Sequence, residues 1–125
     1  MVKRTTITNK GKRISFEVDA NYFYPEHINN VAELTDKVFN GSFANMEYCV
    51  LYTKVKVDWG EKYENRWGVP ACVRYNNGLV GYQCGDFYHT EEEAKKHYEA
   101  RLKLDGGLTK QFDTCDVMLI KNNIH

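Results

Sequence analysis

Apolar and polar residues alternate strictly along residues 13–18, RISFEV. This period of two places every apolar member on one face of an extended strand: Ile14, Phe16 and Val18. A threonine-rich segment, residues 4–9, precedes it across the turn Lys10-Gly11-Lys12. The two segments predict a β-hairpin whose second strand is half-buried.

Residues 25–39 show the spacing of a helix instead, with apolar side chains three or four positions apart. These apolar positions are Ile28, Val31, Leu34, Val38 and Phe39. Pro25 suits the first turn of this helix. We expect Asn40-Gly41 to end it, because glycine accepts the left-handed conformation that follows a last helical turn.

A second helix is predicted over residues 91–104. Thr90 and Glu93 have the spacing of a capping box at its start. Apolar side chains then recur every fourth residue and predict one buried stripe: Ala94, Tyr98 and Leu102. Asp105-Gly106-Gly107 follows and is expected to end the helix.

Residues 46–59 form a long extended segment. In its second half one face carries Thr53, Val55, Val57 and Trp59, and the other carries Lys54, Lys56 and Asp58. We expect the first face to be core and the second to be either a basic stripe or simply solvated. Residues 60–68 are polar and charged and predict a loop.

Residues 70–75 and 79–84 form the clearest predicted hairpin. A two-residue turn at Asn77-Gly78 places Arg74 opposite Gly81. Because Gly81 has no side chain, Arg74 would have room to extend into a pocket.

With a final strand predicted over residues 110–121, the order of elements is ββαβββαβ. This order predicts a single α+β domain spanning residues 1–125, with one antiparallel sheet and two helices packed on it. The length of 125 residues is close to the commonest domain size.

The charges of the chain balance, with 17 Lys and Arg residues against 17 Asp and Glu residues. Proteins that bind long nucleic acids usually carry a positive excess, so we expect no such partner. A neutral chain also resists self-association poorly, and we expect a homo-oligomer. No apolar run reaches the ~20 residues that span a membrane, and no signal-peptide core follows Met1, which predicts a cytoplasmic protein without a membrane partner.

The cysteines are widely spaced and form no C-x-x-C pair: Cys49, Cys72, Cys84 and Cys115. In a reducing cytosol we expect free thiols in strands rather than disulfides or a zinc site. His89, Glu93 and His97 are spaced like ligands along one side of a helix, but they do not match the H-E-x-x-H arrangement. We therefore predict no metal site and no cofactor.

Aromatic side chains stand directly before the second helix, at Phe87, Tyr88 and His89. They either pack the start of the helix or bind an aromatic, phosphorylated ligand. His97 and Arg101 lie four residues apart on a face next to the buried stripe. They are either solvated or directed toward a ligand or a partner.

Two further clusters carry aromatic rings: Arg66-Trp67 and Tyr22-Phe23-Tyr24. Each cluster either caps the edge of the core, anchors a subunit interface or stacks on a base. Recognition of a nucleotide requires an aromatic face for the base and an arginine fork for the phosphate. The candidate ligand-binding residues are therefore Phe87, Tyr88, His89, Arg101, His97, Arg74, Arg66, Trp67 and Phe23.

Sequence motifs of enzymes are missing from the chain, including G-x-S-x-G, the P-loop and G-x-G-x-x-G. Cys84 continues the apolar alternation of Val80 and Tyr82, so we interpret it as a core residue rather than a nucleophile paired with His89. We expect a binding protein and no catalytic residues.

Three stretches of the chain carry a family resemblance: ISFEV in the first hairpin, YFYP before the first helix, and FYHTEEEAKKHYEARL in the second helix. In these stretches, in length and in element order, the chain resembles the phage anti-Thoeris sponge family. The resemblance implies a small oligomer in the bacterial cytosol that binds a cyclic ADP-ribose-derived immune signal without cleaving it. Some members of that family also hold cyclic oligonucleotides. No functional residue is carried over from the family.

The first hypothesis is therefore a phage or prophage anti-defence protein that sequesters a cyclic nucleotide-type signal. In the alternative, the aromatic residues form the hot spot of a protein-binding inhibitor that blocks a bacterial defence nuclease, as anti-CRISPR proteins do. A third hypothesis is a domain that binds single-stranded RNA through aromatic residues of the sheet.

Overall fold

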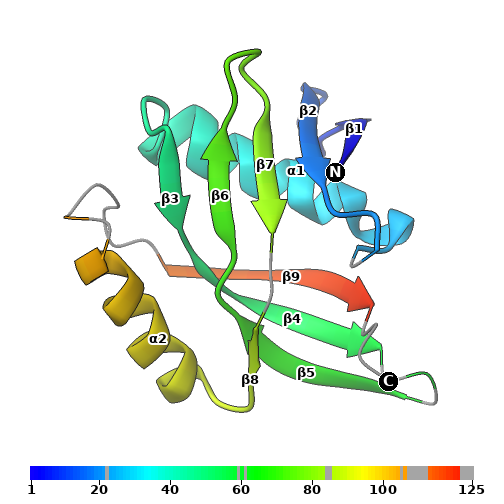
Figure 1. Cartoon of the computed structure of the whole chain (residues 1–125). Helices are drawn as coiled ribbons and strands as arrows, with labels where there is room; N and C mark the ends of the chain where they lie inside the picture. Colours follow the sequence, from blue (N-terminus) through cyan, green and yellow to red (C-terminus); the bar gives the residue numbers. More distant parts are fainter. Residues whose placement is uncertain are drawn as a thin grey trace.

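A computed structural model describes residues 1–21, 23–58, 60, 62–83, 86–104, 106 and 113–121. For Tyr63 and for residues 113–121 it describes the backbone alone. Two sheets lie one above the other, with one long helix against each (Figure 1). The helix α1 packs on the upper sheet, and α2 packs beside the lower one.

The upper sheet has five strands in the order β1-β2-β7-β6-β3. Their bounds are Val2–Ile7 for β1, Arg13–Val18 for β2, Val80–Gln83 for β7, Ala71–Arg74 for β6 and Tyr48–Val50 for β3. All neighbours are antiparallel except β2 and β7, which run parallel. The predicted N-terminal hairpin is confirmed as β1 and β2, and Ile14, Phe16 and Val18 are buried as expected.

The lower sheet has four strands in the order β8-β5-β4-β9. Their bounds are Phe87–Tyr88 for β8, Tyr63–Gly68 for β5, Tyr52–Asp58 for β4 and Asp113–Lys121 for β9. The strand β9 runs parallel to β4, while β5 is antiparallel to both β4 and β8. Residues 60–68 were expected to form a loop, and that prediction was wrong because most of them form β5.

The two sheets are joined where the chain passes directly from one to the other. Only Leu51 separates β3 from β4, and only Val69 and Pro70 separate β5 from β6. At this crossing the Leu51 N–H donates to the Pro70 carbonyl oxygen over 3.1 Å. Leu51 and Val69 are both fully buried, so the crossing lies in the interior.

The first helical region has three parts. A 3-10 turn, Pro25–His27, leads into α1, Ile28–Lys37, and a π-helical turn, Val38–Ser42, follows. Gly41 does not adopt a positive φ, so the predicted left-handed stop is wrong. The helix ends instead through the wider turn, which Phe43 closes by donating its N–H to the Val38 carbonyl oxygen at 2.6 Å.

The second helix, α2, has the predicted bounds Glu91–Leu104. The Thr90 hydroxyl accepts a hydrogen bond from the Glu93 N–H at 3.2 Å, as a capping residue does. Ala94 and Tyr98 are buried, and Leu102 is half-buried. The predicted buried stripe is therefore confirmed.

The α+β class is confirmed, but the strands do not form one antiparallel sheet. They are divided between two sheets, and each sheet contains one parallel pair. Hydrophobic periodicity reports which face of a strand is buried, but not the direction of its neighbour. The single-sheet prediction failed for that reason.

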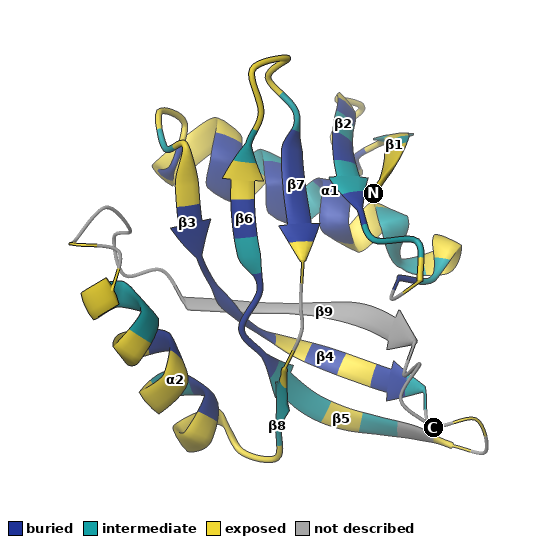
Figure 2. Ribbon diagram, viewed as in Figure 1, coloured by how far each residue is buried: buried dark blue, intermediate teal, exposed yellow. Residues whose placement is uncertain are grey.

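Among the side chains that the structure describes, buried residues form two cores. The larger core lies between α1 and the five-stranded sheet and also takes in Val55 and Val57 of β4. The smaller core lies under α2 and contains Val50, Tyr52 and Tyr98. Figure 2 shows the corresponding pattern, since the sides of α1 and α2 that face the sheets are buried and their outer sides are exposed.

A buried hydroxyl pair ties α1 to the centre of the upper sheet. The Thr35 hydroxyl donates to the Val31 carbonyl oxygen at 2.8 Å, so the Tyr82 hydroxyl must donate to the Thr35 oxygen, also at 2.8 Å. The Tyr82 ring makes edge contacts with Phe16 and Phe39. Burial raises the pKa of Tyr82 well above its usual value, which keeps the hydroxyl protonated as the donor.

This geometry predicts an order for two substitutions. Thr35→Val removes the acceptor and leaves the buried Tyr82 hydroxyl unsatisfied, which should cost about 1–3 kcal/mol of unfolding free energy. Tyr82→Phe leaves Thr35 bonded to Val31 and should cost less, about 0.5–1.5 kcal/mol. Urea denaturation of both variants measures the difference. A larger loss for Tyr82→Phe would contradict the assigned direction of the bond.

Candidate functional site

A cavity of about 350 Å³ opens beside α2 on the lower sheet. Five residues line it: Lys54, Asn65, Arg66, Trp67 and His89. Lys54 comes from β4, the next three residues come from β5, and His89 directly follows β8. The cavity therefore brings together candidates from two separate stretches of the sequence, Arg66-Trp67 and residues 87–89.

The pleat of β4 and β5 places Lys54 and Trp67 side by side. The two residues are direct cross-strand partners, and the Lys54 amine lies 5.6 Å from the centre of the Trp67 ring. This distance is within the range of a cation–π interaction. The ring of buried Tyr52 lies 5.8 Å from that of Trp67 and supports it from the core. The site thus combines a positive charge with a fixed aromatic ring.

Arg66 borders the cavity but belongs to the other face of β5. Successive side chains of a strand point to opposite faces, so Arg66 lies opposite Trp67 across the sheet. Its guanidinium is 2.5 Å from a carboxylate oxygen of Glu64, and its side chain is only 12% exposed. Glu64 therefore compensates the charge of Arg66, and Lys54 supplies the positive charge of the cavity.

The three residues before α2 have three different environments. Phe87 packs against the larger core, while Tyr88 packs against the smaller one. The Tyr88 ring stacks on His97 of α2, with centroids 4.4 Å apart and an angle of 18° between the planes. His89 is exposed at the cavity. Phe87 and Tyr88 therefore pack against the cores, and His89 lines the cavity.

The register extends this arrangement across the sheet. Trp67 is the cross-strand partner of both Lys54 and Tyr88, so these three side chains share one face. His97 follows next through its stack on Tyr88. His97 therefore lies next to the row formed by Lys54, Trp67 and Tyr88, but His97 does not line the cavity.

Arg101 does not line this cavity. Its guanidinium donates to the Val69 carbonyl oxygen at 3.2 Å and lies 3.7 Å from a carboxylate oxygen of Asp86. Both contacts fix α2 against the lower sheet, close to the crossing between the sheets. Arg101 therefore positions the helix that flanks the site.

The predicted position of Arg74 was wrong. Arg74 pairs with Val80, and Gly81 pairs with Val73, because the hairpin closes from Tyr75 to Leu79 around a three-residue turn. The extra turn residue shifts the register by one position. The space above Gly81 is filled by the ring of Tyr75.

The Arg74 guanidinium is engaged with three carbonyl oxygens and does not extend into a pocket. It donates to Phe39 at 2.8 Å and to Met46 and Gly78 at 3.4 Å each. Phe23 is likewise a core residue, with 4% of its surface exposed. Its neighbour Tyr22 and the core candidate Cys84 lie outside the described residues. Cys49 and Cys72 are buried free thiols in strands, as expected.

Two lining residues were not among the predicted candidates. The sequence placed Lys54 on the polar face of its strand, but it did not show that Trp67 is the cross-strand partner of Lys54. Asn65 was assigned to a loop. The lower sheet brings them together, and only the pairing of β4 with β5 reveals it.

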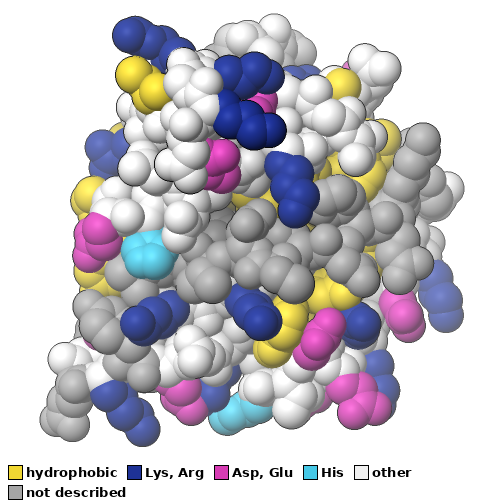
Figure 3. Space-filling model, turned by 180° about the vertical axis from the view of Figure 1, so that it is seen from behind, with side chains coloured by type: hydrophobic (Ala, Val, Ile, Leu, Met, Phe, Trp, Pro, Cys, Tyr) yellow, Lys and Arg dark blue, Asp and Glu magenta, His cyan; other side chains and the backbone are white. Residues whose placement is uncertain are grey.

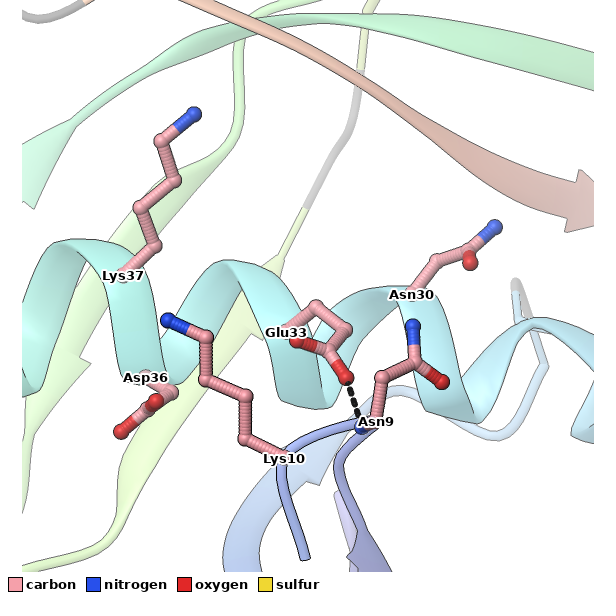
Figure 4. Close-up of a pocket in the computed structure, with 6 residues that line it drawn as sticks. All are labelled: Asn9, Lys10, Asn30, Glu33, Asp36 and Lys37. Atoms are coloured by element: carbon pink, nitrogen blue, oxygen red, sulfur yellow. Dashed lines mark hydrogen bonds between the residues drawn. The ribbon is translucent and has the colours of Figure 1, made fainter. Parts of the chain in front are cut away.

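A larger hollow of about 470 Å³ lies between the β1–β2 turn and α1 (Figure 4). Its carboxylates are already occupied: Glu33 accepts from the Asn9 N–H, and Asp36 accepts from Lys12 at 3.0 Å. In Figure 4, Lys37 points away from Asn9. The hollow is therefore a polar joint between the hairpin and the helix, whereas the smaller cavity combines the Trp67 ring with the amine of Lys54.

On the face shown in Figure 3, Lys and Arg side chains are interspersed with Asp and Glu side chains. In the part of the chain that the structure describes, no helix is long and apolar enough to cross a membrane. Within the same residues, no three His, Cys, Asp or Glu side chains form a metal-binding group.

Comparisons with protein-family models, with curated proteins and with solved structures gave no match to this chain. The candidate site therefore rests on its geometry.

The contacts of Asp36 at the polar joint beside α1 predict that the stability of the fold depends on pH. The hydrogen bond from Lys12, with help from Asn40, lowers the pKa of Asp36 below its usual 3.8. The carboxylate form then stabilises the fold above the unfolded-state pKa, and this contribution is lost as the pH falls through the lower folded-state pKa. Asp36→Asn should cost up to about 1 kcal/mol at neutral pH, and the difference from wild type should shrink in acid. Denaturant unfolding across acidic to neutral pH measures it, and a pH-independent difference would contradict the assignment.

The contacts of Arg101 predict a loss of stability rather than a neutral change. Arg101→Ala removes the bond to the Val69 carbonyl and the ion pair with Asp86, and should cost about 1 kcal/mol. Lys103→Ala, an exposed position on the same helix, is the matched control and should stay within about 0.5 kcal/mol of wild type. Thermal unfolding of both variants provides the comparison. Equal melting temperatures would show that Arg101 does not hold α2.

Proposed function

We propose that this chain binds and sequesters a cyclic nucleotide-type immune signal, a cyclic ADP-ribose derivative or a cyclic oligonucleotide, without cleaving it. The observation that carries the proposal is the cavity lined by Trp67, Lys54 and His89, in which the Lys54 amine lies 5.6 Å from the centre of the Trp67 ring. It supports a ligand that contains both an aromatic base and an anionic group.

Four of the five lining residues each match one part of such a ligand. The face of Trp67 can stack on a base, and stacking of this kind is sequence-tolerant because every base has a π-face. Lys54 and His89 can contact phosphate oxygens. The Asn65 amide has both donors and an acceptor for the edge of a base or a ribose hydroxyl. The volume of about 350 Å³ is within the usual range for small-molecule sites.

The charge of the lining set also favours an anion. None of its five residues is acidic, although the whole chain is neutral. Glu64 neutralises Arg66 on the opposite face of β5, so it does not cancel the charge of Lys54. A local positive site on a neutral surface suits a small anion better than a long nucleic acid, which requires an extended basic surface.

Sequestration is a better match to the lining residues than turnover. The set contains no thiol, hydroxyl or carboxylate nucleophile, and His89 has no acidic orienting partner among the residues that line the cavity. The resemblance of three sequence stretches to the anti-Thoeris sponge family supports the same proposal, in the setting of a phage or prophage protein.

Isothermal titration with cyclic ADP-ribose derivatives and cyclic dinucleotides tests the site. Trp67→Ala should lose about ten- to a hundredfold in affinity, since stacking on one base is worth about 1–3 kcal/mol. Lys54→Ala should lose affinity and weaken its salt dependence. Lys56→Ala is the matched control, because Lys56 is exposed on the same strand face and does not line the cavity. Equal effects of Lys54→Ala and Lys56→Ala would remove the cavity from the binding site.

The fate of the ligand tests sequestration separately. After the complex forms and free ligand is removed, heat should release the ligand chemically unchanged. Chromatography and mass spectrometry of the released material identify it. Recovery of a linear or hydrolysed product would show that the protein is an enzyme.

A second function is favoured by one other observation. Tyr48 and Val73 are cross-strand partners, and these two residues and Tyr75 are each more than a third exposed. Because their neighbours Cys49 and Cys72 belong to the larger core, Tyr48 and Val73 lie on the opposite face of the upper sheet. Such a surface suits a protein-binding inhibitor of a defence nuclease. Thermal shift separates the two functions: small nucleotides should raise the melting temperature of a sequestering protein and leave that of a protein inhibitor unchanged.

A further inference from the structure

The strand β1 forms an open edge of the upper sheet. It stands first in the strand order, and none of the described strands pairs with its outer side (Figure 1). The Thr8 N–H donates to the Lys12 carbonyl oxygen at 2.8 Å, in line with the β1–β2 register. Because hydrogen-bonded positions alternate, Val2, Arg4 and Thr6 direct their backbone groups toward β2. Lys3, Thr5 and Ile7 therefore direct their backbone groups outward, away from β2.

We propose that a second copy of this chain pairs with β1 along this edge, antiparallel, with Thr5 opposite Thr5 on a two-fold axis. Lys3 of one copy then lies opposite Ile7 of the other. All three outward-facing positions become hydrogen-bonded pairs, which gives about six new backbone hydrogen bonds. This inference goes beyond the proposed ligand-binding function and does not rest on it.

The side chains select this register. A two-fold axis normal to the sheet keeps each face on its own side, so only residues that share a face lie opposite each other. A register centred on Arg4 would oppose two like charges, which is destabilising. A register centred on Thr6 would leave Lys3 outside the ladder. The register centred on Thr5 avoids both costs and opposes two threonines, a favourable cross-strand pair.

This pairing covers an exposed apolar side chain. Ile7 is 56% exposed, and the aliphatic stem of Lys3 from the second copy would cover it while the amine stays in water. Arg4 lies opposite Thr6 of the second copy, which is an uncharged partner.

The charge of the chain agrees with a second copy as the partner. The formal net charge is zero, so two copies bring no overall repulsion to the interface. The two cations at this edge, Lys3 and Arg4, lie opposite uncharged residues in the proposed register.

Light scattering over a concentration series tests the proposal. The wild type should give twice the chain mass of 14.6 kDa at high micromolar concentration. Thr5→Pro removes an N–H that points outward, which an edge strand tolerates, so it should stay folded by circular dichroism but give the single-chain mass. Thr5→Val removes the same hydroxyl but keeps the N–H, and it should remain a dimer. A single-chain mass for the wild type at every concentration, or a folded dimeric Thr5→Pro, would overturn the proposal.

Cross-linking tests the register and does not depend on a tolerated proline. Thr5→Cys should form a covalent dimer with oxidised glutathione, which takes up the two hydrogens of the two thiols, as seen on a non-reducing gel. Arg4→Cys should form much less, and the wild type controls for the native cysteines. Stronger cross-linking at position 4 than at position 5, or none at position 5 above the wild type, would overturn the Thr5-centred register.

Discussion

The crossing of the chain between the two sheets, held by the Leu51–Pro70 hydrogen bond, is the constraint on which the rest of the structure depends. It lets β3 continue as β4 and β5 continue as β6, with no long loop between the sheets. Buried Leu51 and Val69 fill the crossing, and the carbonyl of Val69 also accepts from Arg101. One interior point therefore fixes both the relation of the sheets and the placement of α2.

The candidate cavity follows from that placement. The crossing sets β4 and β5 in register, which puts Lys54 beside Trp67, and the position of α2 brings His97 onto Tyr88. Buried Tyr52 fixes the tryptophan ring from below, so its orientation costs little on binding. A rigid ring, a cation and an amide at one cavity are the features on which the proposed nucleotide binding rests.

Local signals in the sequence predicted the parts of the fold that local chemistry determines. The alternation of residues 13–18, the cap at Thr90 and the stripe through Tyr98 each act within a few residues, and each prediction was confirmed. β5 was missed because its polar residues become a strand only between β4 and β8. Aromatic Trp67 and His89 could be chosen from sequence, but their meeting at Lys54 depends on long-range pairing that no local pattern reports. The predicted register of Arg74 was wrong by one residue, because the hairpin closes around a three-residue turn rather than the predicted two-residue turn.

Nucleotide binding at the Trp67 cavity is tested by a nuclear magnetic resonance titration of isotope-labelled protein with a cyclic ADP-ribose derivative. The signals of the Trp67 indole N–H, the Asn65 side-chain amide and the His89 backbone amide should shift together and saturate at one ligand per chain. The amides of β2 should stay in place, since they belong to the upper sheet. Shifts confined to the upper sheet, or a Trp67 signal that does not move while ligand binds, would contradict binding at the Trp67 cavity.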